Sequence, residues 1–270
     1  MNTSLDFPPT ASGPQAVMEE RMTETDRSTT PRKPVRAPSG GPRTLAIDIG
    51  GTRLKAAVLD EAGQMLVDRV RVDTPVGRPP EDIVAALVKL VAPLQEFDRV
   101  SVGFPGAVRT GKVLTAPNLK HEGWQGFDLA AALETRLGKP TRVSNDADVQ
   151  GLGVIAGKGV ELVITLGTGF GTGLYLDGRI GPHLELAHQP LRKGETYEEQ
   201  LGNAALKRVG KKKWNKRLRR AIKHLQALVT YDHLYIGGGN AKKVALDLDP
   251  NITIVSNEAG ILGGIALWRD

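Results

Sequence analysis

Apolar runs of strand length, separated by glycine turns, open the globular part of the sequence. One run covers residues 45–47, a Gly50-Gly51 pair follows shortly after it, and a second run covers 54–59. Two apolar runs joined by a tight glycine turn are typical of a β-hairpin. A third run over 65–72 follows another turn, so the sequence predicts an antiparallel meander of three strands.

The rest of the chain alternates runs of strand length with segments of helical period. Apolar residues recur every three or four positions over 80–94, which predicts an amphipathic helix. Further helices are expected over 127–137, over 197–229 with a break at Gly210, and over 257–268. Further strands are expected over 99–104, 113–114, 141–144, 161–166, 174–176, 234–236 and 252–255. This alternation indicates an α/β fold.

The opening pattern returns in the second half of the chain. Strand, glycine-rich turn and strand occur at Leu45 and again at Leu162, where residues 167–173 read GTGFGTG. We therefore expect an internal duplication in which two similar halves place their glycine turns toward one cleft. A cleft between two halves is a common place for a ligand to bind.

The first 42 residues differ in composition from the rest. They hold 7 of the 17 prolines and a balanced set of 5 acidic and 5 basic residues, with few large apolar side chains. Such a segment buries too little apolar surface to offset the entropy that is lost on ordering. We expect residues 1–42 to form a disordered extension.

Composition also narrows the class of protein. The 270 residues contain no cysteine, which excludes disulfides, thiol catalysis and cysteine-ligated zinc. The sequence has neither an apolar stretch of roughly 18 residues nor an apolar signal core, so we expect a cytoplasmic protein without a membrane partner. P-loop, dinucleotide-binding and zinc-protease motifs are absent as well.

Three glycine-rich turns, each placed after an apolar strand, are candidate phosphate sites. Glycine lets the backbone approach a ligand closely, and successive N–H groups in such a turn form a concave anion site. At the first turn, Lys55 adds a positive charge, and Asp48 offers an oxygen ligand for Mg²⁺, directly or through water. The first turn alone could equally be an ordinary hairpin, but three turns in a duplicated pattern favour phosphate binding. The candidate residues are Asp48, Gly50, Gly51, Thr52, Lys55, Gly167, Thr168, Gly169, Gly237 and Gly238.

The formal net charge of +6 is concentrated in one block of the chain. Residues 207–223 hold ten Lys or Arg and no acidic residue, and like charges on one helix repel each other. One interpretation is a solvated helix face, and the other is a track for a polyanion. Nucleic acid is disfavoured because Trp214 falls on the apolar stripe of the helix rather than among the charges. An inorganic phosphate chain is favoured, with contacts from Lys211, Lys212, Lys213, Lys216 and Arg217.

Several motifs together resemble the ROK family of sugar kinases over residues 43–270. They are the turn at 48–52, TAPNL at 115–119, SNDAD at 144–148, LGTGFGTG at 166–173 and ELAH at 185–188. RKGETYEEQLG at 192–202 and GKKKWNKRL at 210–218 are similar to the branch of the family that uses inorganic polyphosphate. The resemblance implies a duplicated actin-like (ribonuclease-H-like) ATPase fold with two domains around a cleft. The implied domains are 43–146, completed by a C-terminal helix at 257–270, and 147–256.

The resemblance also implies an activity. It implies Mg²⁺-dependent phosphoryl transfer from inorganic polyphosphate to the 6-hydroxyl of glucose, with ATP as a second donor. The enzyme is then expected to be a homodimer without structural zinc. Asp146 is then the general base, because a sugar hydroxyl is a poor nucleophile until a carboxylate accepts its proton. From the residues alone, the alternative for Asp146 is an Asx turn that ends a strand.

Two other functions stay open at this point. One is an ATP-dependent hexokinase of the same family, acting on glucose, mannose or fructose. The other is a non-catalytic sugar sensor, which is disfavoured by the presence of Asp146 and by the lack of a DNA-binding domain in the sequence.

The sugar site follows from the same resemblance. Each hydroxyl of a hexose needs a polar partner in a dry site, and the implied partners are Asn118, Asn145, Glu185, His188 and Glu198. Ala187 departs from the family pattern, which has glycine there, and its methyl group narrows the expected pocket. The remaining histidines have no supporting motif; they are His121, His183, His224 and His233.

Overall fold

The computed structural model describes residues 40–94, 96–256 and 263–269. All of them belong to one compact unit. The extension expected over residues 1–42 lies almost entirely outside the described residues. No helix in the described ranges is long and apolar enough to cross a membrane.

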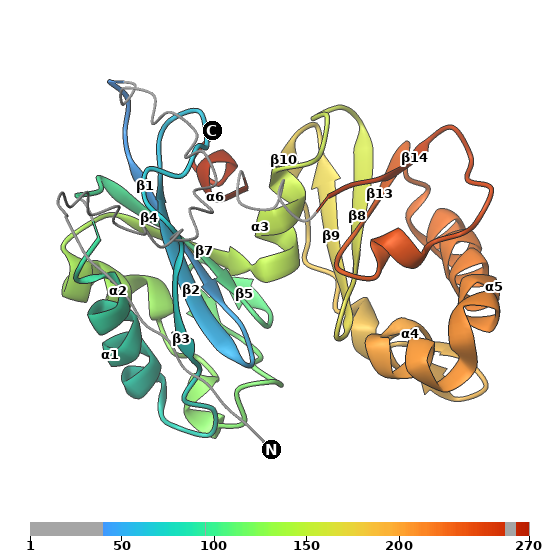
Figure 1. Cartoon of the computed structure of the whole chain (residues 1–270), viewed down its shortest axis with the longest axis horizontal. Coiled ribbons are helices and arrows are strands. Elements are labelled where there is room, and N and C mark those ends of the chain that lie inside the picture. The colour runs from blue at the N-terminus through green and yellow to red at the C-terminus, as the bar shows by residue number, and fades with distance from the viewer. Residues whose placement is uncertain (1–39, 95, 257–262, 270) are drawn as a thin grey trace, which may run out of the picture. The chain divides into compact units, whose positions relative to one another are not determined.

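The first sheet contains the expected meander and continues it with two parallel strands (Figure 1). Its strand order is β3-β2-β1-β4-β7, in which β1, β2 and β3 are antiparallel neighbours and β1, β4 and β7 are parallel. β3 is shorter than expected, because Met65 makes only an isolated bridge to Leu59 before the regular strand begins. The strands are β1 (Thr44–Ile49), β2 (Arg53–Leu59), β3 (Val70–Asp73), β4 (Arg99–Phe104) and β7 (Thr141–Asn145).

Two helices pack against the first sheet, and their ends carry the expected signals. α1 (Pro80–Val91) has proline in its first turn and buries an apolar stripe that includes Ile83 and Leu87. α2 (Leu129–Leu137) begins where the Asp128 side chain accepts a hydrogen bond from the Ala131 N–H, and it ends at the left-handed Gly138. The apolar residues of both helices join the strands in one core cluster.

The second sheet repeats the topology of the first. Its order is β10-β9-β8-β13-β14, again an antiparallel meander followed by two parallel strands. Two sheets with the same order and directions confirm the internal duplication. The strands are β8 (Val160–Leu166), β9 (Phe170–Leu176), β10 (Arg179–Ile180), β13 (His233–Gly237) and β14 (Ile252–Ile254).

The glycine-rich stretch between β8 and β9 is only partly a turn. We expected the returning strand to begin at Leu174, but β9 begins at Phe170 and the turn covers only 167–169. Gly171 therefore lies within the strand, where a Cβ would come within 2.4 Å of the Thr165 hydroxyl and 3.1 Å of the Ala147 Cβ. Glycine within a strand permits such close approach of neighbouring elements, and tertiary packing here overrides the turn signal.

α3 (Asp146–Leu152) was not expected from the sequence, which predicted only that the strand over 141–144 stops at Asn145 and Asp146. Asn145 caps it: its side-chain Oδ1 accepts hydrogen bonds from the N–H groups of Ala147 at 2.8 Å and Asp148 at 3.2 Å. The helix packs against strands of both sheets. α3 is therefore the element that joins the two halves of the duplication (Figure 1).

The long helical region after the second meander begins at Tyr197 as expected, but it is interrupted at Gly202 as well as at the expected Gly210. α4 (Tyr197–Leu201) begins with a capping box formed by Thr196 and Glu199. α5 (Asn203–Val229) has a non-helical backbone at Gly210, with φ of 74°, which confirms the expected break. The shorter elements are β5 (Val108–Arg109), β6 (Lys112–Val113), η1 (Glu122–Trp124), η2 (Leu186–His188), β11 (Pro190–Arg192), β12 (Glu195–Thr196) and η3 (Ala241–Lys243).

The C-terminal helix α6 (Gly263–Ala266) packs against the first sheet and against α3. The Ser101 hydroxyl donates to the Gly264 carbonyl oxygen, and the Trp268 indole N–H donates to the same hydroxyl at 2.8 Å. Residues 257–262 of the expected helix lie outside the described residues.

Gly263→Ala is expected to destabilise the protein, because a Cβ at this position would lie 1.5 Å from the Val149 carbonyl oxygen of α3. Replacing glycine by alanine within a helix normally raises the free energy of unfolding by about 1 kcal/mol. Overpacking lowers it by about 1–3 kcal/mol. The backbone oxygen cannot rotate away, so we expect the cost to prevail. Thermal unfolding should show a lower Tm, by about 2–4 °C for each kcal/mol lost.

Gly40→Ala is the matched control, because no atom of the described residues lies within 4 Å of a Cβ added there. A Tm of the Gly263 variant equal to that of this control would show that α6 is not tightly wedged against α3.

Candidate functional site

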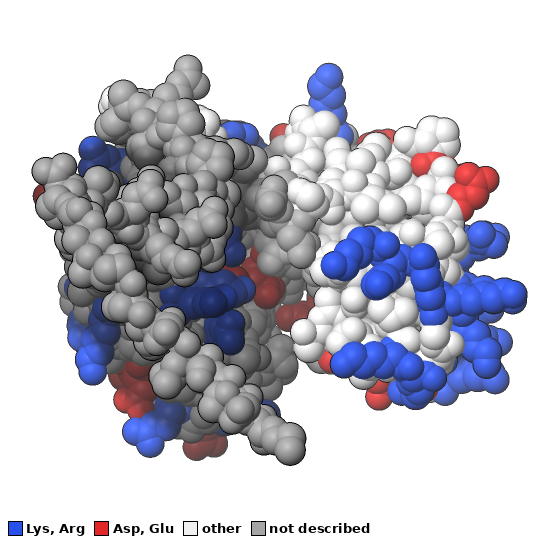
Figure 2. All heavy atoms as spheres, in the orientation of Figure 1, with Lys and Arg blue, Asp and Glu red and all other residues white. Residues whose placement is uncertain are grey.

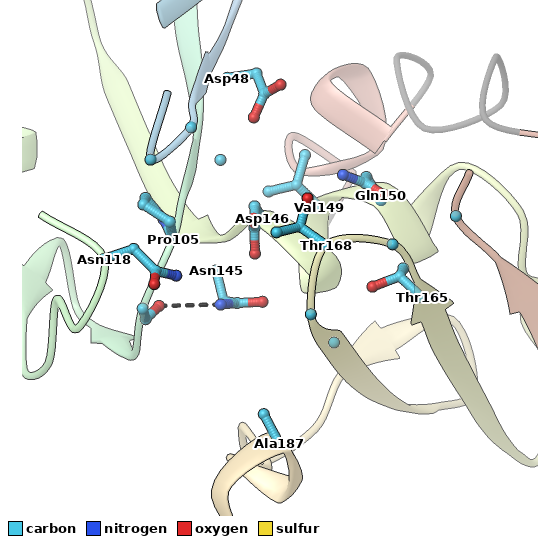
Figure 3. Close-up of a pocket in the computed structure, with 18 of the residues that line it drawn as sticks. Asp48, Pro105, Asn118, Asn145, Asp146, Val149, Gln150, Thr165, Thr168 and Ala187 are labelled. Atoms are coloured by element: carbon cyan, nitrogen blue, oxygen red, sulfur yellow. Dashed lines mark hydrogen bonds between the residues drawn. The ribbon is translucent and has the colours of Figure 1, made fainter. Parts of the chain in front are cut away.

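A cavity of about 780 Å³ lies between the two sheets. Its walls are the β1–β2 turn, the ends of β4 and β7, the start of α3, the β8–β9 turn and the segment around η2. In Figure 3 the side chains of Asp48, Asn118, Asn145 and Thr168 surround that of Asp146. The predicted residues that line the cavity are Asp48, Gly50, Gly51, Thr52, Lys55, Asn118, Asn145, Asp146, Gly167, Thr168, Gly169, Glu185, His188, Glu198 and Gly238.

Two groups of predicted residues do not line this cavity. Gly237 is buried in β13, where a Cβ would contact the Val255 side chain at 3.3 Å, and the following Gly238 and Gly239 take its place in the wall. The five basic residues predicted on α5 are also absent from the lining. The glycine turn therefore reaches the cavity one residue later than expected.

Asp48 and Lys55 form an ion pair at the first turn. They face each other across the β1–β2 register, and the Lys55 Nζ lies 2.8 Å from the Asp48 Oδ2. Both side chains are partly exposed, at 36% for Lys55 and 43% for Asp48. The lysine is thus held at the cavity by a carboxylate, so an incoming anion meets a paired cation rather than a free one.

Close approach of two loops explains the glycine pair of this turn. A Cβ at Gly51 would lie 3.3 Å from the Asn118 Cβ, and one at Gly50 would lie 2.9 Å from the Arg53 carbonyl oxygen. The Thr74 hydroxyl donates to the Gly50 carbonyl oxygen at 2.6 Å and fixes the turn from the other side. The turn is therefore rigid and brings Asn118 next to the backbone of the turn.

Asn145 is fully hydrogen-bonded by the fold itself. Besides capping α3 through Oδ1, its Nδ2 donates to the carbonyl oxygens of Gly106 at 3.1 Å and Phe104 at 3.4 Å (Figure 3). These bonds tie the ends of β4 and β7 to the start of α3. Asn145 thus holds the start of α3, and with it Asp146, in a fixed position.

Asp146 stands in the first turn of α3 with its side chain at the cavity. A carboxylate at a helix N-terminus is normally favoured in its charged form, and its Oδ1 accepts a hydrogen bond from the Ala147 N–H at 2.8 Å. Burial outweighs this and, together with the negative charge of Asp48, raises the pKa of Asp146 to about 7. A carboxyl group with a pKa near neutrality is suited to accept a proton during catalysis.

His183 is a cavity residue that the sequence analysis missed. Its Nδ1 lies 2.9 Å from the Asp148 Oδ2, and its Nε2 lies 3.2 Å from the Glu185 Oε1. Burial lowers the pKa of His183, but the hydrogen bonds to both carboxylates outweigh burial and raise it to about 10. The same contact lowers the pKa of Glu185. The sequence contained one signal for this contact. His183 and Glu185 are two residues apart, and residues at this spacing in an extended segment point to the same face.

The opposite wall places Glu198 against the second glycine turn. A Cβ at Gly169 would lie 2.4 Å from the Glu198 Oε2, so this carboxylate lies directly against the glycine turn. The Asn203 N–H, at the start of α5, donates to the carbonyl oxygens of Gly167 and Thr168 at 3.0 and 3.2 Å. The start of α5 thereby fixes the position of the turn.

The basic block on α5 gathers at the surface of the second half of the molecule (Figure 2). The sequence showed no acidic partner for it, but Glu195 of β12 lies 3.2 Å from Arg208 and 3.9 Å from Arg217. Arg217 is half-buried and also donates to the Gln200 carbonyl oxygen at 3.4 Å. The exposed members are Lys207, Arg208, Lys211, Lys212, Lys213, Lys216, Arg219 and Lys223.

A second basic segment lies beside this block. The Asn215 side chain of α5 donates to the Lys243 carbonyl oxygen at 3.1 Å and accepts from the Ala245 N–H at 2.7 Å, which holds η3 against the helix. η3 carries Lys242 and Lys243 and follows the glycines that line the cavity. The chain thus runs from the cavity wall to the basic face of α5 within a few residues.

Asp146→Asn is expected to raise the Tm at pH 8, because the folded-state pKa of Asp146 lies above the ordinary value of about 3.9 for an unfolded chain. Between these two values the folded state binds more protons, so the wild type loses stability as the pH rises toward about 7. The amide carries no charge and escapes this loss. Thermal unfolding at several pH values should show a higher Tm at pH 8, by about 2–4 °C for each kcal/mol that is recovered.

The gain should shrink as the pH falls and should disappear well below the ordinary pKa of about 3.9, where the wild-type carboxyl is protonated in both states. Asp68→Asn, at an exposed aspartate, is the control and should show no such pH-dependent difference. An Asp146 variant that is equally or less stable than the wild type at pH 8 would mean that the carboxylate is not destabilised by its site.

The chain is similar to several known proteins. The model of the ROK family matches residues 44–203. The polyphosphate glucokinase of Mycobacterium leprae is 28% identical over 273 residues, which covers 93% of this chain and 83% of the relative. The inorganic polyphosphate/ATP-glucomannokinase of Arthrobacter sp. strain KM is 33% identical, with a TM-score of 0.73 over 83% of this chain and 97% of that one. A ROK family glucokinase from Streptomyces griseus shares the fold, with 21% identity, a TM-score of 0.65 and coverage of 83% and 98%.

Proposed function

Because this chain belongs to the ROK family, we propose that it phosphorylates glucose at the 6-hydroxyl with inorganic polyphosphate as donor and ATP as a second donor. The observation that carries the proposal is Asp146, a carboxyl group with a pKa of about 7 at a cavity flanked by two glycine turns. The names of the Mycobacterium leprae and Arthrobacter relatives, both of which include polyphosphate, support the choice of donor.

In the proposed reaction, the oxygen of the sugar 6-hydroxyl attacks the terminal phosphorus of the donor, and Asp146 accepts the hydroxyl proton. The bond from that phosphorus to the bridging oxygen breaks, and the bridging oxygen leaves with the bonding electrons on the shortened donor. Such phosphoryl transfer depends mainly on positioning and on electrostatic stabilisation of the phosphate oxygens. The backbone of the two glycine turns and Lys55 would supply these contacts.

The sugar would lie between Asp146 and the segment around η2. Amide, carboxylate and imidazole groups pair with neighbouring hydroxyls, and a buried hydroxyl left without a partner costs affinity. Asn118 would contribute from the first half, and Glu185, His188 and Glu198 from the second half. Asn145, which the sequence predicted to bind the sugar as well, already uses both donors and both acceptor sites of its amide within the fold, so it would act by holding Asp146 in place.

Mg²⁺ would be held by Asp48 together with the donor phosphates. The described residues offer no group of three His, Asp or Glu that could hold a metal, but Mg²⁺ commonly binds through one or two carboxylates and the substrate phosphates. Asp48 fits this mode because its carboxylate is 43% exposed and lines the cavity. The ion would neutralise negative charge on the phosphoryl group when bound.

We also propose a cytoplasmic homodimer whose partners are sugar and phosphate donor, without a nucleic acid. Two alternative functions are separated by one assay, in which glucose 6-phosphate is measured with each donor. Turnover with ATP alone would favour an ATP-dependent hexokinase. Glucose binding without turnover by either donor would favour a non-catalytic sugar sensor.

Asp146→Asn should abolish most of this turnover while glucose binding persists. Removal of a general base typically lowers the rate by about 10²–10⁴-fold, and the amide keeps the shape of the side chain. Coupled assays would give kcat with each donor, and calorimetry would give the affinity for glucose. If the variant kept more than about a tenth of the wild-type kcat, the assignment of Asp146 as the base would be wrong.

The basic surface of α5 and η3 supports polyphosphate as the longer of the two donors. A chain that leaves the cavity at Gly238 would pass Lys242 and Lys243 before it reaches the exposed lysines of α5. ATP, with three phosphates, would be held within the cavity by the glycine turns. We therefore propose that the track comprises Lys211, Lys212, Lys213, Lys216 and Arg217, extended by Lys242 and Lys243.

Replacing Lys211, Lys212, Lys213 and Lys216 together by Gln should impair polyphosphate use far more than ATP use. Arg217 is left intact because it pairs with Glu195 and Gln200. Surface contacts to phosphates are screened over about 8–10 Å at physiological salt, so added salt should weaken polyphosphate use less in this variant than in the wild type. Equal loss with both donors would point to a structural role for the block.

The control removes four exposed charges elsewhere, at Lys89, Lys112, Lys158 and Arg179, and leaves the two basic segments unchanged. It has the same net charge as the test variant. Similar losses in both variants would show that only the overall charge matters.

A further inference from the structure

The His183 imidazole lies between two carboxylates and is part of neither the proposed chemistry nor a sequence motif. Its Nδ1 is 2.9 Å from Asp148 and its Nε2 is 3.2 Å from Glu185. A neutral imidazole has a single N–H and could donate to only one of them, whereas an imidazolium donates to both. The contacts therefore fit a permanently charged histidine with both ring nitrogens protonated.

The two carboxylates on either side of His183 differ in how firmly they are held. The Asp148 side chain is only 3% exposed and stands on α3, where the Tyr175 hydroxyl donates to the Asp148 carbonyl oxygen at 2.7 Å. The Glu185 side chain is 35% exposed and lines the cavity. The contacts thus run from a rigid helix, through the imidazolium, to the carboxylate that faces the ligand.

We infer that His183, anchored by Asp148, is a positioning residue that holds the Glu185 carboxylate ionised and oriented toward the sugar. The inference rests on the proposed function, in which Glu185 binds sugar hydroxyls. A carboxylate that is fixed before the ligand arrives loses less freedom on binding than a mobile one. A charge-assisted hydrogen bond from His183 also fixes which oxygen of Glu185 remains available for the sugar.

His183 also balances the charges that surround the reacting group. Asp146 and Asp148 approach from α3, Asp48 from β1, and Glu185 and His188 from the segment around η2. The negative charges of Asp148 and Glu185 both raise the pKa of Asp146. Without the imidazolium, these two carboxylates would act on Asp146 uncompensated. Loss of His183 should therefore shift the acid limb of the kcat/KM profile to higher pH.

The test replaces His183 by Asn, which is short and uncharged and cannot bridge both carboxylates. Hydrogen bonds to charged groups are strong enough that we expect the KM for glucose to rise by about tenfold or more, with a smaller change in kcat and none in the KM of the donor. His224→Asn, at an exposed position on α5, is the control and should leave all three constants unchanged.

A double-mutant cycle with Glu185→Gln separates positioning from general structural damage. If His183 acts through Glu185, the double variant should bind glucose about as weakly as Glu185→Gln alone, because interacting residues are not additive. Full additivity, or an unchanged KM and acid limb in a folded His183→Asn variant, would overturn the inference.

A measurement on the wild-type protein covers the case in which the variants fail to fold. The ¹⁵N shifts of the His183 ring report directly whether both nitrogens carry protons, and we expect the charged form at pH 8. A neutral ring at pH 8 would contradict the inference. The proposed function fails separately, if the wild type shows no glucose binding and no turnover with either donor.

Discussion

The hydrogen bonds of Asn145 at the start of α3 are the interaction on which the rest of the site depends. One amide caps the helix through Oδ1 and binds the carbonyl oxygens that end β4 through Nδ2. These bonds fix the first turn of the helix that packs on both sheets, and that turn carries Asp146 and Asp148. A buried amide with all its hydrogen bonds satisfied has a single favourable orientation. The backbone that carries Asp146 and Asp148 is therefore held in one position.

Several carboxyl groups lie close together at the cavity, and most of them have a cationic partner. Asp48 is paired with Lys55, and Asp148 and Glu185 share His183. Among the described residues, Asp146 has no cationic partner of this kind, and burial leaves it with a pKa of about 7. The other three carboxylates each have a cationic partner, and Asp146 is left free to change its protonation state near neutral pH. Catalytic groups are commonly tuned by neighbours and burial in this way.

The duplication sets where phosphate and sugar can meet. Each half contributes a glycine turn after its first strand, and the repeated strand order brings both turns to the same cavity. In the second half the insertion of α4 and α5 adds the basic surface, part of which is balanced by Glu195. The second half thus carries a basic surface outside the cavity, which we propose as the track for a long anionic donor.

The sequence by itself determined the repeated pattern of strand, glycine turn and strand, and the break at Gly210, because these depend on local periodicity and backbone freedom. It also marked Asp146, Glu185 and the basic block through motifs that are contiguous in the chain. Tertiary structure alone decided the start of β9, the existence of α3 and the pairing of His183 with Asp148. These depend on groups up to 35 residues apart, and on close packing at glycines whose neighbours the sequence does not reveal. Contacts between distant segments leave no periodic signal, so only the folded chain could show which carboxylates share a cation and which one stands alone.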